Sequence, residues 1–348
     1  MKTLAVGDAV ARFLLTYILP KRYGDRIRRN IEPRTITILA TGEINRDSPR
    51  MTLIEGVFAT LLFDLALFGT DNIFINGIIR IFTKIQNCWN KSFPSEMEAT
   101  KQIQQFCVAL SIQTKPWIWE KPIEQYGSLN DFFSRRYAPK FMPPLNKVEV
   151  VAPACCTMQM YESDGDMRRV LIKGCEYSLE RIGLPDLSST SNNSSDLMQY
   201  GRNRVFLGYL SPTDYHRVHS PIEGTCVHCS LEGPQSLSAS VKFFGGRFNI
   251  LNENTRLIVV IEKELRSGIK TRLGLVIVGG VGVNTIIFDP DMKGKPIKKG
   301  GEIATFRAGG SAFAMFTTYP VDLTKQYASV AKGLAEVKVL VGEGIGNF

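Results

Sequence analysis

Histidine is scarce in this sequence, which holds only 3 among 348 residues. Two of them, His216 and His219, lie three positions apart, and His228 follows in the same region. Histidine is the side chain best suited to moving protons near neutral pH. Any proton-transfer chemistry by histidine is therefore confined to this one part of the chain.

The sequence also has no uninterrupted apolar run of the ~18–20 residues that a membrane-spanning helix needs. Residues 51–87 are the most apolar stretch, but charged residues that include Glu55, Asp64, Asp71 and Arg80 interrupt them, and they predict two helices with wide apolar faces. Residues 13–19 are apolar and precede five basic residues between positions 21 and 29. This pattern predicts an amphipathic helix on an anionic membrane surface, with an ordinary core helix as the alternative.

No disulfide framework is evident, because the 7 cysteines are odd in number and irregularly spaced. A signal peptide with a small-residue cleavage site is not evident either. The formal net charge of +9 favours an anionic partner. Without an aromatic and basic motif, a nucleic acid is not expected, so an anionic membrane surface is the predicted partner.

The pattern of residue types changes near position 147, where short β-prone runs begin to alternate with Gly, Pro and Asn. We expect strands at residues 148–151, 205–210, 257–261, 273–278, 285–288 and 312–319. The predicted fold class is α+β, with a helical, membrane-associating region at 1–124 and a β-rich catalytic domain at 125–320. Residues 321–348 are expected to form a C-terminal tail.

Residues 214–221 read Asp-Tyr-His-Arg-Val-His-Ser-Pro and form the first candidate site. Together with Cys226 and Cys229 downstream, His216 and His219 form a His-x-x-His and Cys-x-x-Cys pattern whose side chains could bind a zinc ion. The spacing between the pairs is short for a zinc module, and in a strand the two cysteines would point to opposite faces. Core or surface thiols are the favoured interpretation, so no metal site is expected.

Residues 309–311, Gly-Gly-Ser, form the second candidate site. A serine hydroxyl can attack the carbonyl of a preceding glycine if the turn is strained and a base is near. The resulting ester can eliminate to leave an amino-terminal dehydroalanine, which hydrolyses to a pyruvoyl group. A tight turn is the plain alternative for these three residues.

Residues 214–221 resemble the Asp-Tyr-His-Arg-x-His-x-Pro motif of phosphatidylserine decarboxylases. Further motifs of that family are matched in the family's order. They are residues 129–135 (Leu-Asn-Asp-Phe-Phe-Ser-Arg), 173–179 (Lys-Gly-Cys-Glu-Tyr-Ser-Leu), 278–282 (Val-Gly-Gly-Val-Gly), 299–302 (Lys-Gly-Gly-Glu) and the Gly-Gly-Ser of 309–311. The resemblance covers about residues 125–320. The N-terminal third matches the family only in its general character, without a matching motif.

The resemblance implies a proenzyme that cleaves itself between Gly310 and Ser311 into two chains. Ser311 would become a covalent pyruvoyl cofactor, which binds the amine of phosphatidylserine and accepts the electrons released with CO₂. The product would be phosphatidylethanolamine. By similarity, His219 would be the base for self-cleavage, and His216 and Asp214 would support it. The enzyme would be membrane-associated, either at the mitochondrial inner membrane or at an endomembrane.

Two residues depart from the family's pattern. The family's Pro-Ala-Asp-Gly motif, whose aspartate pairs with the histidine, is Pro-Ala-Cys-Cys here, with Cys155 in place of the aspartate. A thiol does not supply the constant negative charge that stabilises an imidazolium. Ala312 replaces the usual threonine. The alternative function is therefore an inactive homologue that binds acidic lipid or a partner.

Overall fold

The computed structural model describes most of the chain from position 96 onwards. The described residues are 37–38, 44–45, 96–109, 112, 118–162, 169–172, 175–178, 182–184, 204–211, 213–233, 250–279, 286–307, 311–330 and 336–348. The predicted helices at 13–19 and 51–87 lie outside these residues, so they stay predictions. Within the described residues, no helix is both long and apolar enough to cross a membrane.

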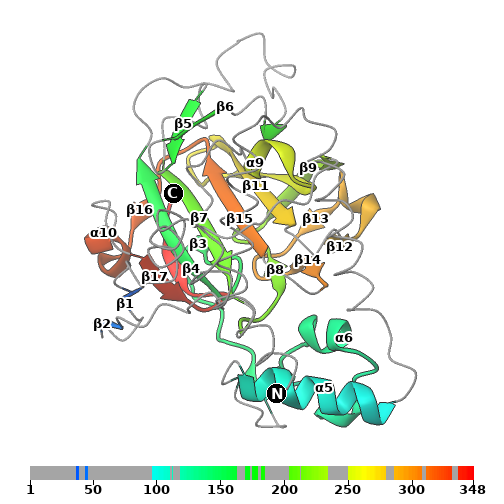
Figure 1. Cartoon of the computed structure of the whole chain (residues 1–348). Helices are drawn as coiled ribbons and strands as arrows, with labels where there is room; N and C mark the ends of the chain where they lie inside the picture. The colour runs from blue at the N-terminus through cyan, green and yellow to red at the C-terminus, as the bar shows by residue number, and fades with distance from the viewer. Residues whose placement is uncertain are drawn as a thin grey trace, which may run out of the picture.

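A ten-stranded sheet dominates the described part of the chain (Figure 1). Neighbouring strands are antiparallel except for β1 and β17, which run parallel. In spatial order the strands are β13 (Pro296–Ile297), β9 (Gly224–Glu232), β10 (Arg256–Glu264), β11 (Lys270–Gly279), β15 (Ser311–Thr317), β7 (Arg204–Leu210), β4 (Cys156–Glu162), β17 (Glu336–Val339), β1 (Thr37–Ile38) and β2 (Ile44–Asn45).

Three small sheets and seven short helices complete the described fold. The small sheets are β12 (Ile286–Phe288), β14 (Glu302–Phe306) and β8 (Arg217–His219); β16 (Asp322–Leu323), β18 (Gly344–Asn347) and β3 (Val150–Val151); and β5 (Arg169–Ile172) with β6 (Cys175–Ser178). The helices are α5 (Glu96–Ala109), η3 (Ile123–Gln125), α6 (Leu129–Phe133), η4 (Pro139–Phe141), α9 (Ile250–Glu253), η7 (Pro290–Met292) and α10 (Lys325–Val330).

Strand β15 is buried along its whole length, between β11 and β7. A strand with both faces covered reads as a continuous apolar run, and Ala312 to Phe316 fit this description. Gly208 of β7 lets the neighbouring strand pack closely, because a Cβ built there would lie 2.1 Å from Cε1 of Phe313. The sheet therefore fixes the position of Ser311, the first residue of β15.

The β-rich part agrees with the sequence-based prediction, since each of the six expected strands overlaps an observed one. The predicted division at position 320 stays a prediction. In the fold, β17 pairs with β4 of the large sheet and β18 pairs with β3. The last residues therefore pack into the β-rich part of the molecule.

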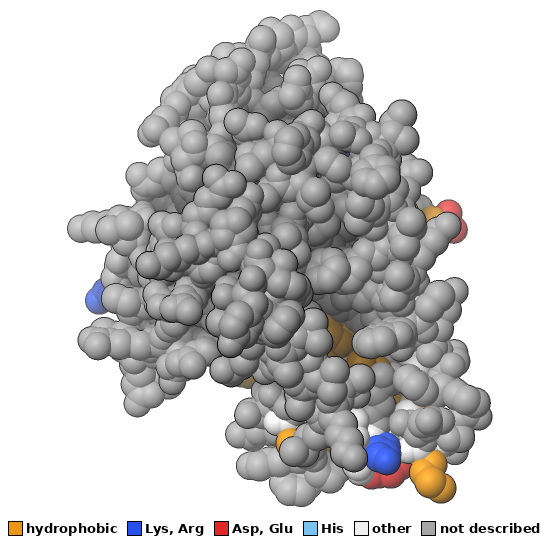
Figure 2. Space-filling model, viewed as in Figure 1, with side chains coloured by type: hydrophobic (Ala, Val, Ile, Leu, Met, Phe, Trp, Pro, Cys, Tyr) orange, Lys and Arg blue, Asp and Glu red, His pale blue; other side chains and the backbone are white. Residues whose placement is uncertain are grey.

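A helical lobe formed by α5, η3 and α6 lies beside the β-rich part (Figure 1). Helix α5 buries Ala99, Ile103 and Cys107, which recur every four residues and so share one face. Ser128 caps α6 by accepting a 3.1 Å hydrogen bond from the backbone N–H of Asp131. In the same orientation, Figure 2 shows exposed hydrophobic side chains at the lower end of the molecule, where Figure 1 places this lobe.

Candidate active site at the His216–His219 segment

A tight turn of residues 298–301 lies against the end of β8, which carries His219. Gly300 has φ of 75°, a conformation that glycine adopts without strain. Its N–H donates to the carbonyl of Ser220 at 2.8 Å, and the N–H of Ser220 donates to Gly301 at 2.7 Å. Beyond the turn, β14 pairs with β8 and places Glu302 opposite His219. The turn therefore packs against the strand end that carries the histidine.

Both ring nitrogens of His219 have a hydrogen-bond partner. Nδ1 lies 2.8 Å from the carbonyl oxygen of Gly300, and Nε2 lies 3.0 Å from the hydroxyl of Tyr215. A carbonyl only accepts, so Nδ1 carries the proton in the neutral ring and Nε2 keeps the lone pair. Burial lowers the pKa of His219, although the Gly300 bond and the Glu302 charge oppose this. The imidazole is thus held neutral, as a base requires.

His216 is completely buried and stacks near the ring of Phe133, with 4.0 Å between ring centroids. Its Nδ1 donates to the backbone carbonyl of Asp214 at 2.8 Å, so Nε2 is an acceptor. Burial, together with the charge of Arg135, lowers the pKa of His216 to about 3. Nε2 is buried and has no hydrogen-bond partner among the described residues, which leaves one open acceptor at this site.

The carboxylate of Asp214 does not bond to either histidine. It accepts from the Lys338 ammonium at 2.5 and 2.6 Å and from the backbone N–H of Ser211 at 2.8 Å. Asp214 therefore contacts His216 only, through its backbone carbonyl, and its side chain links residues 211 and 214 to Lys338 of β17. Lys338 was not predicted, because it lies 124 residues away in sequence.

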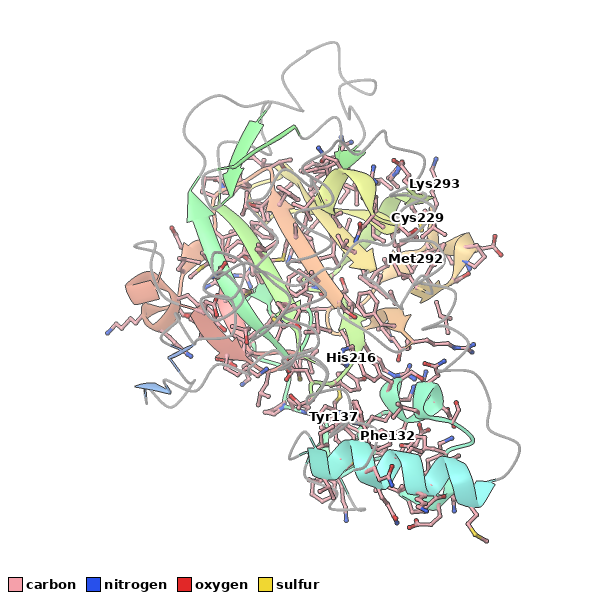
Figure 3. The ribbon with its side chains drawn as sticks, in the orientation of Figure 1. Phe132, Tyr137, His216, Cys229, Met292 and Lys293 are labelled. Atoms are coloured by element: carbon pink, nitrogen blue, oxygen red, sulfur yellow. The ribbon has the colours of Figure 1, made fainter. Side chains whose placement is uncertain are left out.

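Arg135 ties the helical lobe to the same turn. Its guanidinium is buried and donates to the carbonyls of Thr213 and Asp214 at 2.9 and 3.1 Å. It also stacks on the rings of Trp119 and Phe132, 4.4 and 4.8 Å from their centroids. Figure 3 accordingly shows His216 at the junction of the two parts, with Tyr137 and Phe132 on the side of the lobe.

Ser311 is fully buried at the start of β15, where it pairs with Gly279 on one side and Leu210 on the other. Five residues earlier, the backbone N–H of Phe306 donates to the carbonyl of His216 at 3.0 Å. Within the segment between them, residues 308–310, which include Gly310, lie outside the described residues. Both of its ends are therefore anchored on the 210–216 segment that leads to the histidines.

Cys155 is buried behind a row of aromatic rings rather than against the ring of His219. Its Sγ accepts from the N–H of Val341 at 3.4 Å and lies 3.9 Å from the hydroxyl of Tyr137. Tyr137 packs on Tyr215, whose hydroxyl reaches His219. Burial raises the pKa of the Cys155 thiol to about 11, so the thiol is neutral. The backbone links the two sites as well, since His219 N–H donates to Pro153 at 2.7 Å.

The zinc alternative is not supported by the structure. Figure 3 shows Cys229 at the end of the molecule where Met292 and Lys293 lie, well apart from His216. No group of three or more His, Cys, Asp or Glu side chains that could hold a metal occurs among the described residues.

The prediction that Cys226 and Cys229 point to opposite faces is wrong. A bulge in β9 between residues 226 and 228 inverts the alternation of side chains. As a result, both thiols lie against one core cluster.

Comparison with known proteins identifies the family. The family whose model matches is described as phosphatidylserine decarboxylase, and the match covers residues 129–347, more than half of the chain. A phosphatidylserine decarboxylase proenzyme of Fusobacterium nucleatum is 26% identical over 312 residues, which are 88% of this chain and 95% of that protein. Proteins of the same name from Halalkalibacterium halodurans and Chlamydia trachomatis serovar L2 are 28% and 29% identical, covering 66% and 65% of this chain and 80% and 71% of theirs. The chain therefore belongs to the phosphatidylserine decarboxylase family.

Proposed function

We propose that the chain is a self-cleaving proenzyme that converts phosphatidylserine to phosphatidylethanolamine and CO₂. One structural observation carries the proposal: both ends of the segment with the Gly310–Ser311 bond are anchored on the segment that leads to His216 and His219. Phe306 bonds to the carbonyl of His216, and Ser311 pairs with Leu210. The relatives reported above are all named proenzymes, which agrees with cleavage of the precursor.

In the proposed cleavage, Ser311 Oγ loses its proton to a base and attacks the carbonyl carbon of Gly310. The peptide C–N bond breaks as the ester forms, and the amino group of Ser311 is freed. Loss of the α-proton then expels the Gly310 carboxylate and leaves dehydroalanine at position 311. Water hydrolyses its imine tautomer and releases ammonia, which leaves a pyruvoyl group at the new amino terminus.

His219 is the proposed base for the first step, and its surroundings support the assignment. Burial keeps the imidazole neutral, and the Gly300 carbonyl holds the proton on Nδ1. His216 cannot take the same role by becoming a stable cation, because its pKa is about 3. It can instead offer the unpartnered lone pair on its Nε2 to a donor.

The pyruvoyl group would supply a ketone that binds the lipid amine and accepts the electrons released with CO₂. Ser311 fits this role because it is buried at the rigid start of β15, in a water-poor part of the sheet. We further propose that the basic N-terminal region holds the enzyme on anionic lipid, at the mitochondrial inner membrane or an endomembrane. The formal net charge of +9 on the whole chain favours the same surface.

Intact-mass spectrometry of the purified chain tests the proposal. We expect two polypeptides divided between residues 310 and 311, the second beginning with a pyruvoyl group, and CO₂ release from phosphatidylserine vesicles. Ser311→Ala should stay a single chain of about the full 38.9 kDa and release none. Flotation of the same vesicles in a density gradient tests membrane association. A wild-type chain that stays intact would contradict the proposal.

The comparisons give no support to the alternative of an inactive homologue. That alternative rests on Cys155 alone, and the same mass measurement separates the two functions. An inactive homologue would bind vesicles as one intact chain without releasing CO₂. Cleavage of the wild-type chain would exclude it.

A further inference from the structure

Tyr215 lies inside the histidine motif, yet neither the sequence comparison nor the motif assigns it a task. Its side chain is buried, with a relative exposure of 3%. Its hydroxyl lies 3.0 Å from Nε2 of His219, and the two rings stack with centroids 5.7 Å apart. The phenol therefore contacts the one atom of the proposed base that must accept a proton.

The direction of this hydrogen bond follows from the other side of the ring. The Gly300 carbonyl can only accept, so it fixes the proton of neutral His219 on Nδ1. Nε2 then holds the lone pair, and Tyr215 must be the donor. Burial raises the pKa of Tyr215, which keeps the phenol protonated and able to donate.

The ring of Tyr215 is itself held in a row of aromatic side chains. Trp119 stacks on Tyr137 at 4.9 Å between centroids, and Tyr137 packs on Tyr215 at 4.8 Å. Cys155 touches this row at the hydroxyl of Tyr137 and not at His219. The Cys155 side chain thus makes no hydrogen bond to the imidazole, while Tyr215 does.

We propose that Tyr215 is a positioning residue for self-cleavage: in the precursor its hydroxyl holds the His219 ring and the Nε2 lone pair in place, and the Ser311 hydroxyl replaces Tyr215 at that lone pair in the first step. This inference rests on the proposed function, because it assigns His219 the role of base. Gly300 and Tyr215 each form a hydrogen bond with one of the two ring nitrogens of His219, so the ring has one orientation and one tautomer. The charged groups that also act on His219 are Glu302, Arg217 and Arg136.

Tyr215→Phe tests the proposal, with the rate of self-cleavage measured against pH. We expect the plateau rate to fall about tenfold, the size of one positioning hydrogen bond. A bond donated to the lone pair favours neutral His219, so its loss raises the pKa of that ring. The acid limb of the profile should therefore move to higher pH. A purely structural defect would lower the rate at every pH and leave the limb in place, which would overturn the proposal.

Tyr327→Phe is the matched control, because Tyr327 is a buried tyrosine whose hydroxyl donates to Glu343 at 3.3 Å and not to a histidine. The acid limb of the pH–rate profile of Tyr327→Phe should lie at the same pH as that of the wild type. A shift of equal size in this control would also count against Tyr215.

A second measurement needs neither cleavage nor a folded Tyr215 variant. In full-length Ser311→Ala labelled with ¹⁵N at histidine, only 3 rings contribute signals. We expect one ring, lost in His219→Gln, to show a protonated Nδ1 and an unprotonated Nε2. A protonated Nε2 would overturn the inference even if the wild-type chain cleaves itself. If His219 shows the expected tautomer but the wild-type chain never cleaves itself, the proposed function would be contradicted. The hydrogen bond between Tyr215 and His219 would still stand.

Discussion

Position 155 holds a thiol in surroundings that suit a carboxylate. The N–H of Val341 and the hydroxyl of Tyr137 both face the sulfur, at 3.4 and 3.9 Å. Buried carboxylates are stable where such donors are present. The surroundings of position 155 in this chain thus offer hydrogen-bond donors to a carboxylate, although the residue there is a neutral thiol.

Cys155→Asp should therefore speed self-cleavage, by about tenfold or more, because a fixed negative charge near His219 favours its protonated form in the transition state. The rate can be followed by the disappearance of the intact chain after synthesis. Cys155→Asn is the matched control, since asparagine has nearly the same shape as aspartate and its Oδ1 can accept from the same neighbours, but it carries no charge. Equal rates for the two variants would show that charge at position 155 does not limit cleavage.

The sequence suggests which residues form the candidate site, but it does not show most of the contacts that they make. The motif pointed to His216, His219, Asp214 and Ser311. The partner of Asp214 is Lys338, and no local pattern connects positions so far apart. The proton on His219 is placed by a backbone carbonyl, that of Gly300, which carries no side-chain signal at all.

The strands were predictable because burial on both faces leaves continuous apolar runs, as in β10 and β15. The bulge in β9 was not, because one extra residue changes which face Cys229 occupies without changing the composition of the strand. Helix α6 was predictable from Ser128, since its cap is a local interaction. Its attachment to the sheet depends on Arg135 and the distant carbonyls of residues 213 and 214, which are tertiary contacts.

Arg135→Leu should weaken the attachment of the helical lobe to the 213–214 turn. The substitution removes the hydrogen bonds from the guanidinium to the carbonyls of Thr213 and Asp214, of which Asp214 keeps His216 as a donor. We therefore expect the free energy of unfolding to fall by about 2–4 kcal/mol. Urea unfolding of the Ser311→Ala chain measures this. The neighbouring Arg136→Leu is the control, because its half-exposed side chain makes only a surface ion pair with Glu302 and should change stability by about 1 kcal/mol or less. Equal losses in both variants would contradict the anchoring role.

Burial of two histidines at the junction of lobe and sheet makes the stability of the whole molecule depend on pH. The pKa of His216 falls from 6.5 to about 3 on folding, chiefly through burial. Between these values the unfolded chain binds a proton at this position that the folded chain does not bind. The contribution to stability is therefore complete above the unfolded pKa and is lost as the pH falls below it. The lowered pKa of His219 acts in the same direction.

We expect the free energy of unfolding of Ser311→Ala to decrease by about 2 kcal/mol from His216 alone between pH ~6.5 and pH ~5, at about 1.4 kcal/mol per unit. Urea unfolding at a series of pH values measures the slope. His216→Gln should have a shallower slope, because glutamine keeps a donor for the Asp214 carbonyl but does not titrate. Identical slopes in the two proteins would mean that His216 is not held neutral in the folded state. The same burial that makes the site costly to protonate keeps its imidazoles neutral and available as acceptors, so the acid sensitivity of the fold and the neutral state of the histidines have one physical cause.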